Sequence, residues 1–291
     1  MSYTAVTVGN FDGVHLGHIH LINELKKIAE KYNVKPLAIT FEPHPVEVLS
    51  RRNRFFCKLS TLEEKKEIIE NQLGIEVVSI PFTKEFAELS PWKFLEEYLL
   101  KRFNAKVILV GYDWKFGKNA AGTFLTVAEF CAYKGCKALR LDPYKVGDKV
   151  VSSSLIRDLL KKAHLKEATL YLGHPYWIRR KVEKGKGLGR KIGFPTLNLG
   201  NVERLCLPNG VYVVCCDGHP AIANLGYAPT LKGFKRTLEV HILRDAFWVS
   251  DRPRVVFKRF LRPEKAFKTV KDLVEQIKTD IQNAKKIFLT D

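Results

Sequence analysis

The stretch TAVTVGNFDGVHLGHIHLINELKKIAEKY, residues 4–32, decides the fold of the first half of this 291-residue chain. Residues 4–9 form a short apolar run that predicts a strand, and a glycine-rich loop follows it directly. Residues 18–32 then place Leu21, Ile22, Leu25, Ile28 and Ala29 at helical spacing on one face. A strand, a glycine-rich loop and an amphipathic helix in this order predict the first unit of a parallel α/β sheet.

The same alternation of apolar runs and amphipathic segments continues to residue 113. Further strands are predicted at 35–40, 76–80 and 106–113, and further helices at 61–74 and 91–103. The first of these helices begins at a Ser60-Thr61 cap and ends at Gly74, and Pro91 stands in the first turn of the second. This order predicts a doubly wound, Rossmann-like α/β domain, whose ligands bind at the carboxyl ends of the strands.

Beyond residue 172 the chain changes to alternating β-rich stretches separated by Gly, Pro and Asp turns. The stretches are YWIRRKVEKG, GVYVVCCDGHPAIANLGYAP, RTLEVHILR and RPRVVFKRFL. They predict an antiparallel barrel or sandwich, followed by one long helix at 269–288. We therefore expect two domains, residues 1–158 and 159–291, in agreement with a length prior of roughly 150 residues per domain.

Composition places the chain among ordinary globular proteins. The hydrophobic fraction is 46% and the charged fraction is 27%, which provides material for packed cores. No apolar run approaches the roughly 18 residues that span a bilayer, and the N-terminus lacks the basic and apolar regions of a signal peptide. The six cysteines show no CxxC pair, so we expect neither a zinc site nor a disulfide framework but reduced thiols in a cytoplasmic protein.

Positive charge is concentrated in the second half of the chain. Residues 1–160 carry 23 Lys and Arg against 19 Asp and Glu, whereas residues 161–291 carry 26 against 12. Such an asymmetry is typical of a nucleic-acid or membrane surface, of a site for a polyphosphate substrate, or of a solvated basic face. Charge alone leaves these three readings open.

The most informative segment is GNFDGVHLGH at residues 9–18, between the first strand and the first helix. Its three glycines let the backbone approach a phosphate, and the N–H groups at the helix start attract anions. His15 and His18 are three residues apart, so both can face one ligand and donate to phosphate oxygens. Asp12 is a candidate partner for Mg²⁺ or for orienting a histidine. The alternative is that the histidines only cap a turn.

Three other segments are expected at the same edge of the sheet. GYDWKFGKNAAG, residues 111–122, is a glycine- and lysine-rich loop after a strand. VSSSLIR, residues 151–157, places hydroxyls and Arg157 at a helix start, where they act either as plain caps or as a triphosphate clamp. TFEPHP, residues 40–45, ends a strand with Phe41, which can stack on a flat ring.

These four segments, in order over residues 9–157, resemble the adenylyltransferase half of the prokaryotic bifunctional riboflavin kinase/FAD synthetase family. The second half continues the resemblance through five short motifs. GFPTLN at 193–198 is similar to the family's GFPTAN, LPNGVY at 207–212 to LPxGVY, NLGYAPT at 224–230 to NIGxxPT, EVH at 239–241 to ExH, and FLRPE at 260–264 to FLRxE. The resemblance covers nearly the whole chain and implies a small β-barrel for the second domain.

For the first domain, the resemblance implies transfer of AMP from ATP to FMN, giving FAD and pyrophosphate. It assigns catalysis to His15, His18, Asp113 and Arg157. It assigns ATP binding to Gly9, Asn10, Phe11, Asp12, Gly17, Ser153 and Ser154.

For the second domain, the resemblance implies phosphorylation of riboflavin by ATP. Gly193, Thr196 and Asn198 would bind ATP, with Thr196 and Asn198 also holding Mg²⁺. Glu239 would be the general base for the ribityl hydroxyl, the alternative being an ordinary strand carboxylate on a solvated face. The partners implied are the small molecules ATP, riboflavin and FMN, with no nucleic acid and no membrane.

The chain departs from the family pattern at several positions. Leu197 replaces Ala and Ser154 replaces Thr, and neither change removes a required oxygen. Ala228 stands where the NIGxRPT strand has Arg, and residues 246–248 replace the usual LYG. The last two changes concern the kinase half.

Two other function classes compete with this reading. HxGH also occurs in class I aminoacyl-tRNA synthetases, so an RNA-binding or tRNA-ligase-like module is one alternative, but no KMSKS-like loop accompanies it. Another small-molecule adenylyltransferase, acting on pantetheine phosphate or nicotinamide mononucleotide, is a second. The β-rich second half argues against that alternative.

Overall fold

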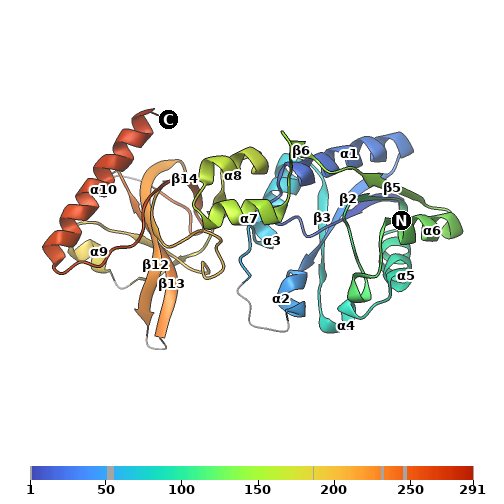
Figure 1. Cartoon of the computed structure of the whole chain (residues 1–291), viewed down its shortest axis with the longest axis horizontal. Coiled ribbons are helices and arrows are strands. Elements are labelled where there is room, and N and C mark those ends of the chain that lie inside the picture. The colour runs from blue at the N-terminus through green and yellow to red at the C-terminus, as the bar shows by residue number, and fades with distance from the viewer. Residues whose placement is uncertain (1, 51–55, 186, 231–232, 245–247, 291) are drawn as a thin grey trace. The chain divides into compact units, whose positions relative to one another are not determined.

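The computed structural model describes all residues except 1, 51–55, 186, 231–232, 245–247 and 291. The chain forms two compact units. Unit 1 comprises residues 1–56 and 60–153, and unit 2 comprises residues 57–59 and 154–291. Unit 1 contains a parallel sheet, and unit 2 contains an antiparallel sheet with a long terminal helix (Figure 1).

The sheet of unit 1 has the strand order β3-β2-β1-β4-β5, and all its pairs are parallel. Its strands are β1 (Thr4–Val8), β2 (Lys35–Glu42), β3 (Glu76–Pro81), β4 (Ala105–Gly111) and β5 (Lys137–Leu141). The chain moves outward from β1 to β3 and then returns to place β4 on the other side of β1. The carboxyl ends of β1 and β4 therefore form the edge at which a doubly wound sheet binds its ligands.

In the part of unit 1 that the structure describes, α-helices connect or flank these strands. They are α1 (Leu16–Tyr32), α2 (Pro45–Leu49), α3 (Leu62–Lys66), α4 (Lys84–Ala87), α5 (Pro91–Phe94) and α6 (Phe124–Lys134). A short hairpin, β6 (Lys145–Val146) with β7 (Lys149–Val150), follows β5. The 3₁₀ turn η3 (Lys118–Ala120) lies in the loop after β4.

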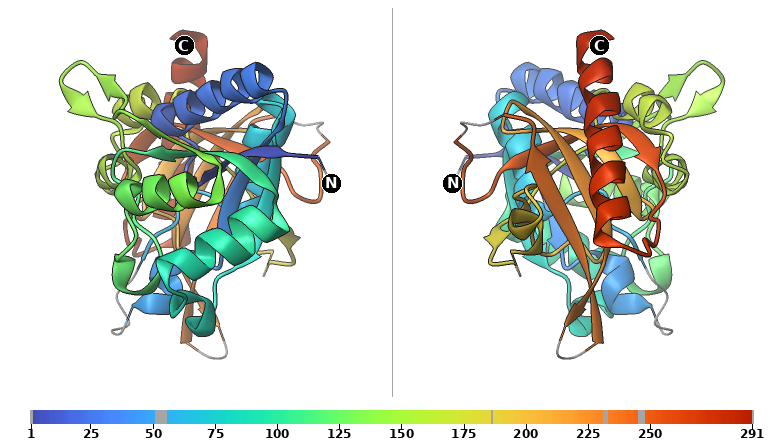
Figure 2. Two further views of the ribbon diagram at one scale, coloured as in Figure 1. Left: turned by 90° about the vertical axis from the view of Figure 1, so that its right-hand side faces the viewer. Right: turned by 90° about the vertical axis from the view of Figure 1, so that its left-hand side faces the viewer.

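Both faces of the parallel sheet are buried, as the doubly wound order requires. Val6 and Val8 belong to one core cluster with Leu99 and Phe130, so η2 (Leu95–Arg102) and α6 cover that face (Figure 2). The residues that alternate with them on β1 are also fully buried, and α1 contributes a buried stripe of its own. The prediction of a parallel α/β domain is confirmed.

The helices of unit 1 differ from the sequence prediction in their bounds and type. α1 begins at Leu16 rather than at residue 18, because the Nδ1 atom of His15 caps it by accepting the N–H of His18 (3.3 Å). The two helices predicted at 61–74 and 91–103 begin as α3 and α5 and widen into the π-helical segments η1 (Glu67–Gln72) and η2. Hydrophobic periodicity marks where such helices lie but not this local widening.

The sheet of unit 2 is antiparallel, has the order β8-β14-β11-β12-β13-β10-β9, and curls into a half-barrel. Its strands are β8 (Trp177–Arg179), β9 (Val182–Glu183), β10 (Leu197–Leu199), β11 (Gly210–Cys216), β12 (His219–Thr230), β13 (Gly233–Ile242) and β14 (Arg254–Arg262). Its helices are α7 (Ser153–Lys161), α8 (Leu165–Leu172), α9 (Leu188–Lys191) and α10 (Val270–Thr290).

Helix α10 lies against the sheet of unit 2 (Figure 2, right). Ala284 of α10 is fully buried in a cluster with Val213 of β11 and Ile222 of β12. Ile281 and Phe288 of the helix pack against the same cluster. The predicted antiparallel second domain with a long terminal helix is thus confirmed.

The expectation that all six cysteines are reduced thiols is wrong for four of them. Cys57 pairs with Cys206 and Cys131 pairs with Cys136, with Cα–Cα distances of 5.0 and 4.5 Å. Cys215 and Cys216 are the two free cysteines. Spacing along the chain could not reveal the first pair, because its members are 149 residues apart and only the fold brings them within bonding distance.

Candidate functional site

The loop after β1 adopts a tightly turned backbone. Phe11, Gly13 and Val14 have φ values of 47°, 84° and 40°, in the left-handed region that side chains other than glycine rarely adopt. Gly9 donates its N–H to the carbonyl of Ile39 (3.0 Å), which fixes the start of the loop to β2. The phenyl ring of Phe11 is fully buried. The loop thus leads from the carboxyl end of β1 into the first turn of α1.

His15 and His18 meet at the start of α1, as the sequence predicts. Their rings stack with centroids 3.6 Å apart and planes 16° apart. A Cβ atom on Gly17 would lie 3.2 Å from the His15 ring, so glycine leaves the room that this stacking needs. The ring of Phe11 stands edge-on to His18 with centroids 5.3 Å apart. The two imidazoles therefore form one pair of nitrogen-bearing rings at a helix N-terminus, which suits an anionic ligand.

The predicted ATP-binding residues Asp12 and Ser153 lie in the same loop region. Asp12 is buried, and the Oγ atom of Ser153 donates to its backbone carbonyl (2.9 Å). The carboxylate of Asp12 accepts the backbone N–H of Ser60 (3.0 Å). Its carboxylate therefore supports the loop, a contact that the sequence did not indicate.

A pocket of about 470 Å³ opens beside this loop, within unit 1. Gly9 and Asn10 form one part of its wall. Six aromatic side chains belong to the remaining wall: Phe41, Phe82, Phe86, Phe94, Trp114 and Phe116. Trp114 and Phe116 stack on one another with centroids 4.2 Å apart and planes 14° apart. A wall of this kind suits a large flat ring.

Phe41 is in this wall, as its predicted stacking role requires, but most of the other aromatic residues were not singled out by sequence reasoning. Phe82 and Phe86 follow β3, whose carboxyl end lies on the same edge of the sheet as the loops after β1 and β4. Their position just after a predicted strand could have indicated them, because the carboxyl ends of all parallel strands lie at one edge of the sheet.

Three other predicted site residues lie outside the loop after β1, one in another turn of unit 1 and two on a helix of unit 2. Asp113 is exposed in the turn after β4, next to Trp114. Ser154 and Arg157 are on α7 within unit 2. Ser154 is exposed, and the Nε atom of Arg157 donates to the carbonyl of Cys57 (3.2 Å).

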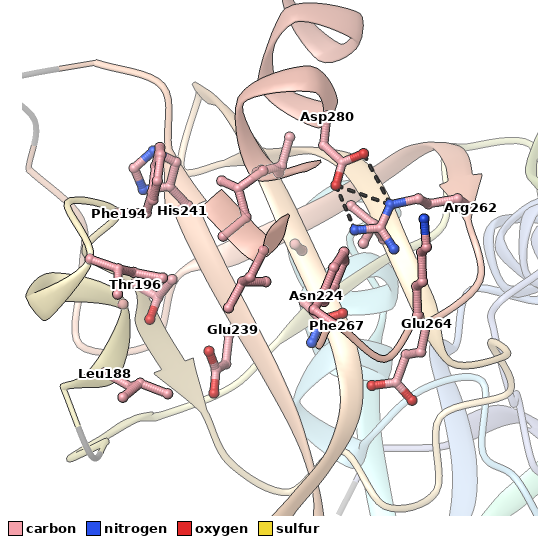
Figure 3. Close-up of a pocket in the computed structure, with 18 residues that line it drawn as sticks. Leu188, Phe194, Thr196, Asn224, Glu239, His241, Arg262, Glu264, Phe267 and Asp280 are labelled. Carbon is pink, nitrogen blue, oxygen red and sulfur yellow. Dashed lines mark hydrogen bonds and ion pairs between the residues drawn. The ribbon is translucent and has the colours of Figure 1, made fainter. Parts of the chain in front are cut away.

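A second pocket, of about 310 Å³, lies in unit 2. Glu239 of β13 projects into it, with Thr196 on one side and Asn224 of β12 on the other (Figure 3). Asn198 of β10 and Asn224 both stand directly opposite Glu239 in the strand pairing. Directly opposed residues share a face of the sheet, so the carboxylate has an amide side chain on each flank.

Burial raises the pKa of Glu239 above the ordinary value of a glutamate. Desolvation disfavours the charged form, and no opposing cation contributes to the shift. A carboxylate with a raised pKa is a stronger proton acceptor than an exposed one. The environment of Glu239 therefore fits general-base chemistry better than the alternative of a solvated strand residue.

The predicted phosphate-binding segment forms one side of this pocket. Gly193 takes a φ of 88° in the turn before Thr196. A Cβ atom on Gly189 would lie 2.4 Å from the carbonyl oxygen of Phe194, so only glycine allows α9 to approach the segment this closely. His241 is linked to the same segment through the carbonyl of Pro195 (2.8 Å). The turn from 189 to 196 is thereby fixed beside Glu239.

Residues of β14 and α10 form the opposite side. Arg262 donates from Nε and Nη2 to both carboxylate oxygens of Asp280, at 3.0 and 2.7 Å (Figure 3). Gln276 adds a hydrogen bond to Asp280 (3.0 Å). Glu264 also lines the pocket and accepts from the Nδ2 atom of Asn209 (3.1 Å). In the sequence, Arg262 and Glu264 are marked only as positions of the FLRPE motif, and no pattern marks Asp280.

The oxygen-bearing side chains around Glu239 fit the metal that the sequence implies. Mg²⁺ prefers hard oxygen ligands and commonly binds through few protein groups plus phosphates. Thr196 and Glu239 supply a hydroxyl and a carboxylate to the pocket wall, and Asn198, which pairs with Glu239 on the neighbouring strand, supplies an amide oxygen. Across the described residues, no cluster of three His, Cys, Asp or Glu side chains forms a separate metal site.

The structure shows the positions of some of the residues that depart from the family pattern. Ala228 lies on β12 opposite Lys235. Trp248 is exposed, whereas Ala246 and Phe247 lie outside the described residues. In the part of the chain that the structure describes, none of the helices has the length and apolar content to cross a bilayer.

Each of the two units matches a known protein family. A family model described as FAD synthetase matches residues 1–155, and one described as riboflavin kinase matches residues 172–288. A curated relative named bifunctional riboflavin kinase/FMN adenylyltransferase, from Bacillus subtilis strain 168, is 34% identical over 298 residues, covering 98% of this chain and 92% of the relative. A relative of the same name from Escherichia coli K12 is 33% identical, covering 97% and 92%.

A solved structure has the same overall fold. It is described as a macrolide-efflux protein from Streptococcus pneumoniae and superimposes with a TM-score of 0.81 at 28% sequence identity. The match covers 97% of this chain and 94% of that one. The likeness therefore extends through both sheets.

Proposed function

The chain belongs to the bifunctional riboflavin kinase/FMN adenylyltransferase family, and we propose that each of its two reactions takes place in one of the two units described above. It is an enzyme of FAD synthesis, with flavin and ATP as substrates. The FAD synthetase model covers the first part of the chain, and the riboflavin kinase model covers the second. We assign adenylyl transfer to residues 1–158 and phosphorylation of riboflavin to residues 159–291.

In adenylyl transfer, a phosphate oxygen of FMN attacks the α-phosphorus of ATP, and pyrophosphate leaves. The chemistry needs charge stabilisation and alignment rather than a protein nucleophile. His15 and His18 stand together at the N-terminus of α1, and we assign them to the oxygens of the α-phosphate. Gly9, Asn10 and Gly17 would let the backbone approach the nucleotide. The assigned roles of Asp113, Ser154 and Arg157 remain predictions from the sequence.

The aromatic pocket beside the loop is the proposed site of the acceptor flavin. Its flat aromatic wall matches the isoalloxazine ring, and Gly9 and Asn10 connect it to the loop that bears the histidines. An FMN whose ring occupies this pocket has its phosphate free to extend toward that loop. The pocket thereby supports FMN, rather than a non-aromatic acceptor, as the second substrate of unit 1.

In the kinase reaction, Glu239 is the proposed base that accepts the proton of the ribityl hydroxyl as it attacks the γ-phosphorus of ATP, and ADP leaves. Asn198 and Asn224 stand opposite Glu239 on the two neighbouring strands and so flank its carboxylate. Thr196 and Asn198 would hold Mg²⁺, which neutralises phosphate charge when bound. Thr196 would in addition hold a phosphate oxygen through its hydroxyl.

The observation that carries this assignment is that each pocket lies within one unit and has a different chemical character. The pocket of unit 1 is rich in aromatic residues and adjoins the loop that bears the histidine pair, whereas the pocket of unit 2 contains a half-buried carboxylate with a raised pKa. Two activities with separate sites should therefore be separable by single substitutions.

The test is flavin chromatography after incubation with ATP and Mg²⁺, with riboflavin supplied in one tube and FMN in another. Wild-type protein is expected to form FMN and FAD from riboflavin, and FAD from FMN. His18→Ala should lower FAD formation by about 100- to 1,000-fold and leave riboflavin phosphorylation unchanged, as for loss of one charge-stabilising donor. Glu239→Ala should do the reverse. Loss of both products in either folded variant would contradict separate sites.

The remaining assignments are part of the same proposal. We propose a cytoplasmic enzyme, since its substrates are metabolites, and we propose no nucleic-acid partner despite the basic second half. A steeply salt-dependent association with tRNA would contradict the latter.

A further inference from the structure

Three hydroxyl side chains from separate elements hold the turned loop after β1. Thr40 of β2 donates from Oγ1 to the carbonyl of Asn10 (3.2 Å). Ser153, the first residue of α7, donates to the carbonyl of Asp12 (2.9 Å). Ser60, in the residues just before α3, makes three further contacts, and its role is not suggested by any motif in the sequence.

Ser60 contacts the loop through three hydrogen bonds. Its backbone N–H donates to Oδ1 of Asp12 (3.0 Å), and its Oγ atom donates to the same oxygen (3.4 Å). The N–H of Gly13 in turn donates to Oγ of Ser60 (2.8 Å). The side chains of Ser60 and Asp12 are both buried, with residue exposures of 6% and 1%. The hydroxyl thus donates and accepts at once, which few side chains of this size can do.

These bonds secure the part of the loop with the least favourable backbone. Gly13 and Val14 both have positive φ, and Val14 carries a β-branched side chain that seldom adopts it. His15 follows directly and supplies both the cap of α1 and the ring that stacks on His18. A turn that relaxed at Gly13 would therefore shift both imidazoles.

We propose that Ser60 is a positioning residue for adenylyl transfer, holding the Asp12-Gly13 turn so that His15 and His18 keep their places. The inference rests on the proposed role of the two histidines in unit 1. Ser60 acts through the loop and need not touch substrate. The sequence suggests only a helix cap here, but Thr61 is the residue that caps α3, by accepting the N–H of Glu64 (3.3 Å).

Because the hydroxyls of Ser60 and Thr61 have different partners, Thr61 provides a matched control. Ser60→Ala removes the hydroxyl that holds the loop, whereas Thr61→Ala removes the neighbouring hydroxyl that caps α3. Ser60→Thr keeps a hydroxyl at the same place. Riboflavin kinase activity, assigned to the other unit, should be unchanged in every variant.

For Ser60→Ala we expect kcat for FAD formation from FMN to fall by about 10- to 100-fold, as for a small displacement of catalytic groups. KM for FMN should change by about twofold or less, because the aromatic pocket is not altered. Ser60→Thr should recover most of the rate, and Thr61→Ala should keep nearly all of it. A kcat for Ser60→Ala within about twofold of wild type, or an equal loss in Thr61→Ala, would overturn the proposal.

Amide hydrogen exchange of the segment 10–18 separates this proposal from the proposed function. Ser60→Ala should speed exchange in that segment, and Ser60→Thr should not. If wild-type protein forms no FAD from FMN, the proposed function fails whatever the exchange result. If exchange is unchanged in Ser60→Ala, the positioning role fails even in an active enzyme. Should Ser60→Ala not fold, Ser60→Cys, of similar size and weaker hydrogen bonding, is expected to give the same result.

Discussion

Glu239 shows how strongly one residue depends on its surroundings. In the sequence it is one carboxylate in an alternating strand, where a solvated position is the common case. In the fold it stands between Asn198 and Asn224 in a pocket, and burial raises its pKa. The same burial that suits it as a base makes its charged form less stable in the native state than in the unfolded chain.

This gives a prediction for pH and stability. Because the pKa of Glu239 is higher in the folded state than in the unfolded state, its contribution to stability falls as pH rises from the unfolded value through the folded one. Glu239→Gln should therefore raise the Tm of unit 2 slightly at pH 7 while lowering riboflavin phosphorylation by about 100- to 10,000-fold. Calorimetry and flavin chromatography on one preparation measure both.

The pH profile provides the accompanying control. Wild-type kcat/KM for riboflavin should fall on acidification at a pH above the ordinary pKa of glutamate, and Glu239→Gln should lose this limb. A lower Tm for Glu239→Gln at pH 7, with kinase activity retained, would show that the carboxylate is a structural group.

At the scale of elements, α10 is the part of unit 2 whose attachment bears most directly on its pocket. Leu273 and Ile277 of this helix line the pocket, and the ion pair of Arg262 with Asp280 ties the helix to β14. The pair is largely buried, with side-chain exposures of 21% for Arg262 and 5% for Asp280. Removing one partner of such a pair leaves the other charge poorly compensated.

We predict that Asp280→Asn lowers the stability of unit 2 by about 1–3 kcal/mol, less than for a fully buried pair because Arg262 retains some exposure. KM for riboflavin should rise because the helix forms part of the pocket wall. FAD formation from FMN should not change. Thermal unfolding and kinase kinetics measure these effects.

Asp272→Asn is the matched control, since Asp272 is an exposed carboxylate in the first turn of the same helix. It should leave KM for riboflavin unchanged. Equal effects of the two substitutions would mean that overall helix charge, and not the pairing with Arg262, attaches α10.

At the scale of the whole molecule, the two disulfides constrain the chain very differently. Cys57 and Cys206 are 149 residues apart in sequence, whereas Cys131 and Cys136 are five apart. In the loop-entropy description, a bridge that closes a longer loop restricts the unfolded chain more. The Cys57–Cys206 bridge also joins residues 57–59 to the rest of unit 2, beside the pairing of Lys58 with Leu205.

We predict that Cys206→Ser lowers the free energy of unfolding by about 4–5 kcal/mol and that Cys136→Ser lowers it by about 2 kcal/mol. Differential scanning calorimetry without reductant gives the comparison. Unfolded, non-reduced protein should expose two reactive thiols, Cys215 and Cys216, and reduction should expose six. Six reactive thiols before reduction would contradict the bridges.

The native protein adds a check on the same bridges. Burial raises the pKa of the Cys216 thiol to about 12, so it should react slowly while the protein is folded. Cys215 is partly exposed and should react first. Fast labelling of Cys216 in folded protein would indicate local opening of β11.

The sequence by itself determined the alternation of strands and helices as far as residue 113, the change from a parallel to an antiparallel sheet, and the family. Apolar periodicity decides these features locally, and short motifs such as GNFDGVHLGH and GFPTLN keep their residues together in the chain. For the same reason it placed His15 with His18 at a helix start, and Glu239 in a β-rich stretch.

Only the tertiary structure decided which distant residues meet. Ser60 reaches Asp12 across 48 residues, Asp280 reaches Arg262 from another element, and Cys57 bonds Cys206 across 149. None of these contacts has a periodic or motif signature, because each depends on how whole elements pack. Hydrogen bonds, ion pairs and disulfides act over a few ångströms in space, and separation along the chain does not record that distance.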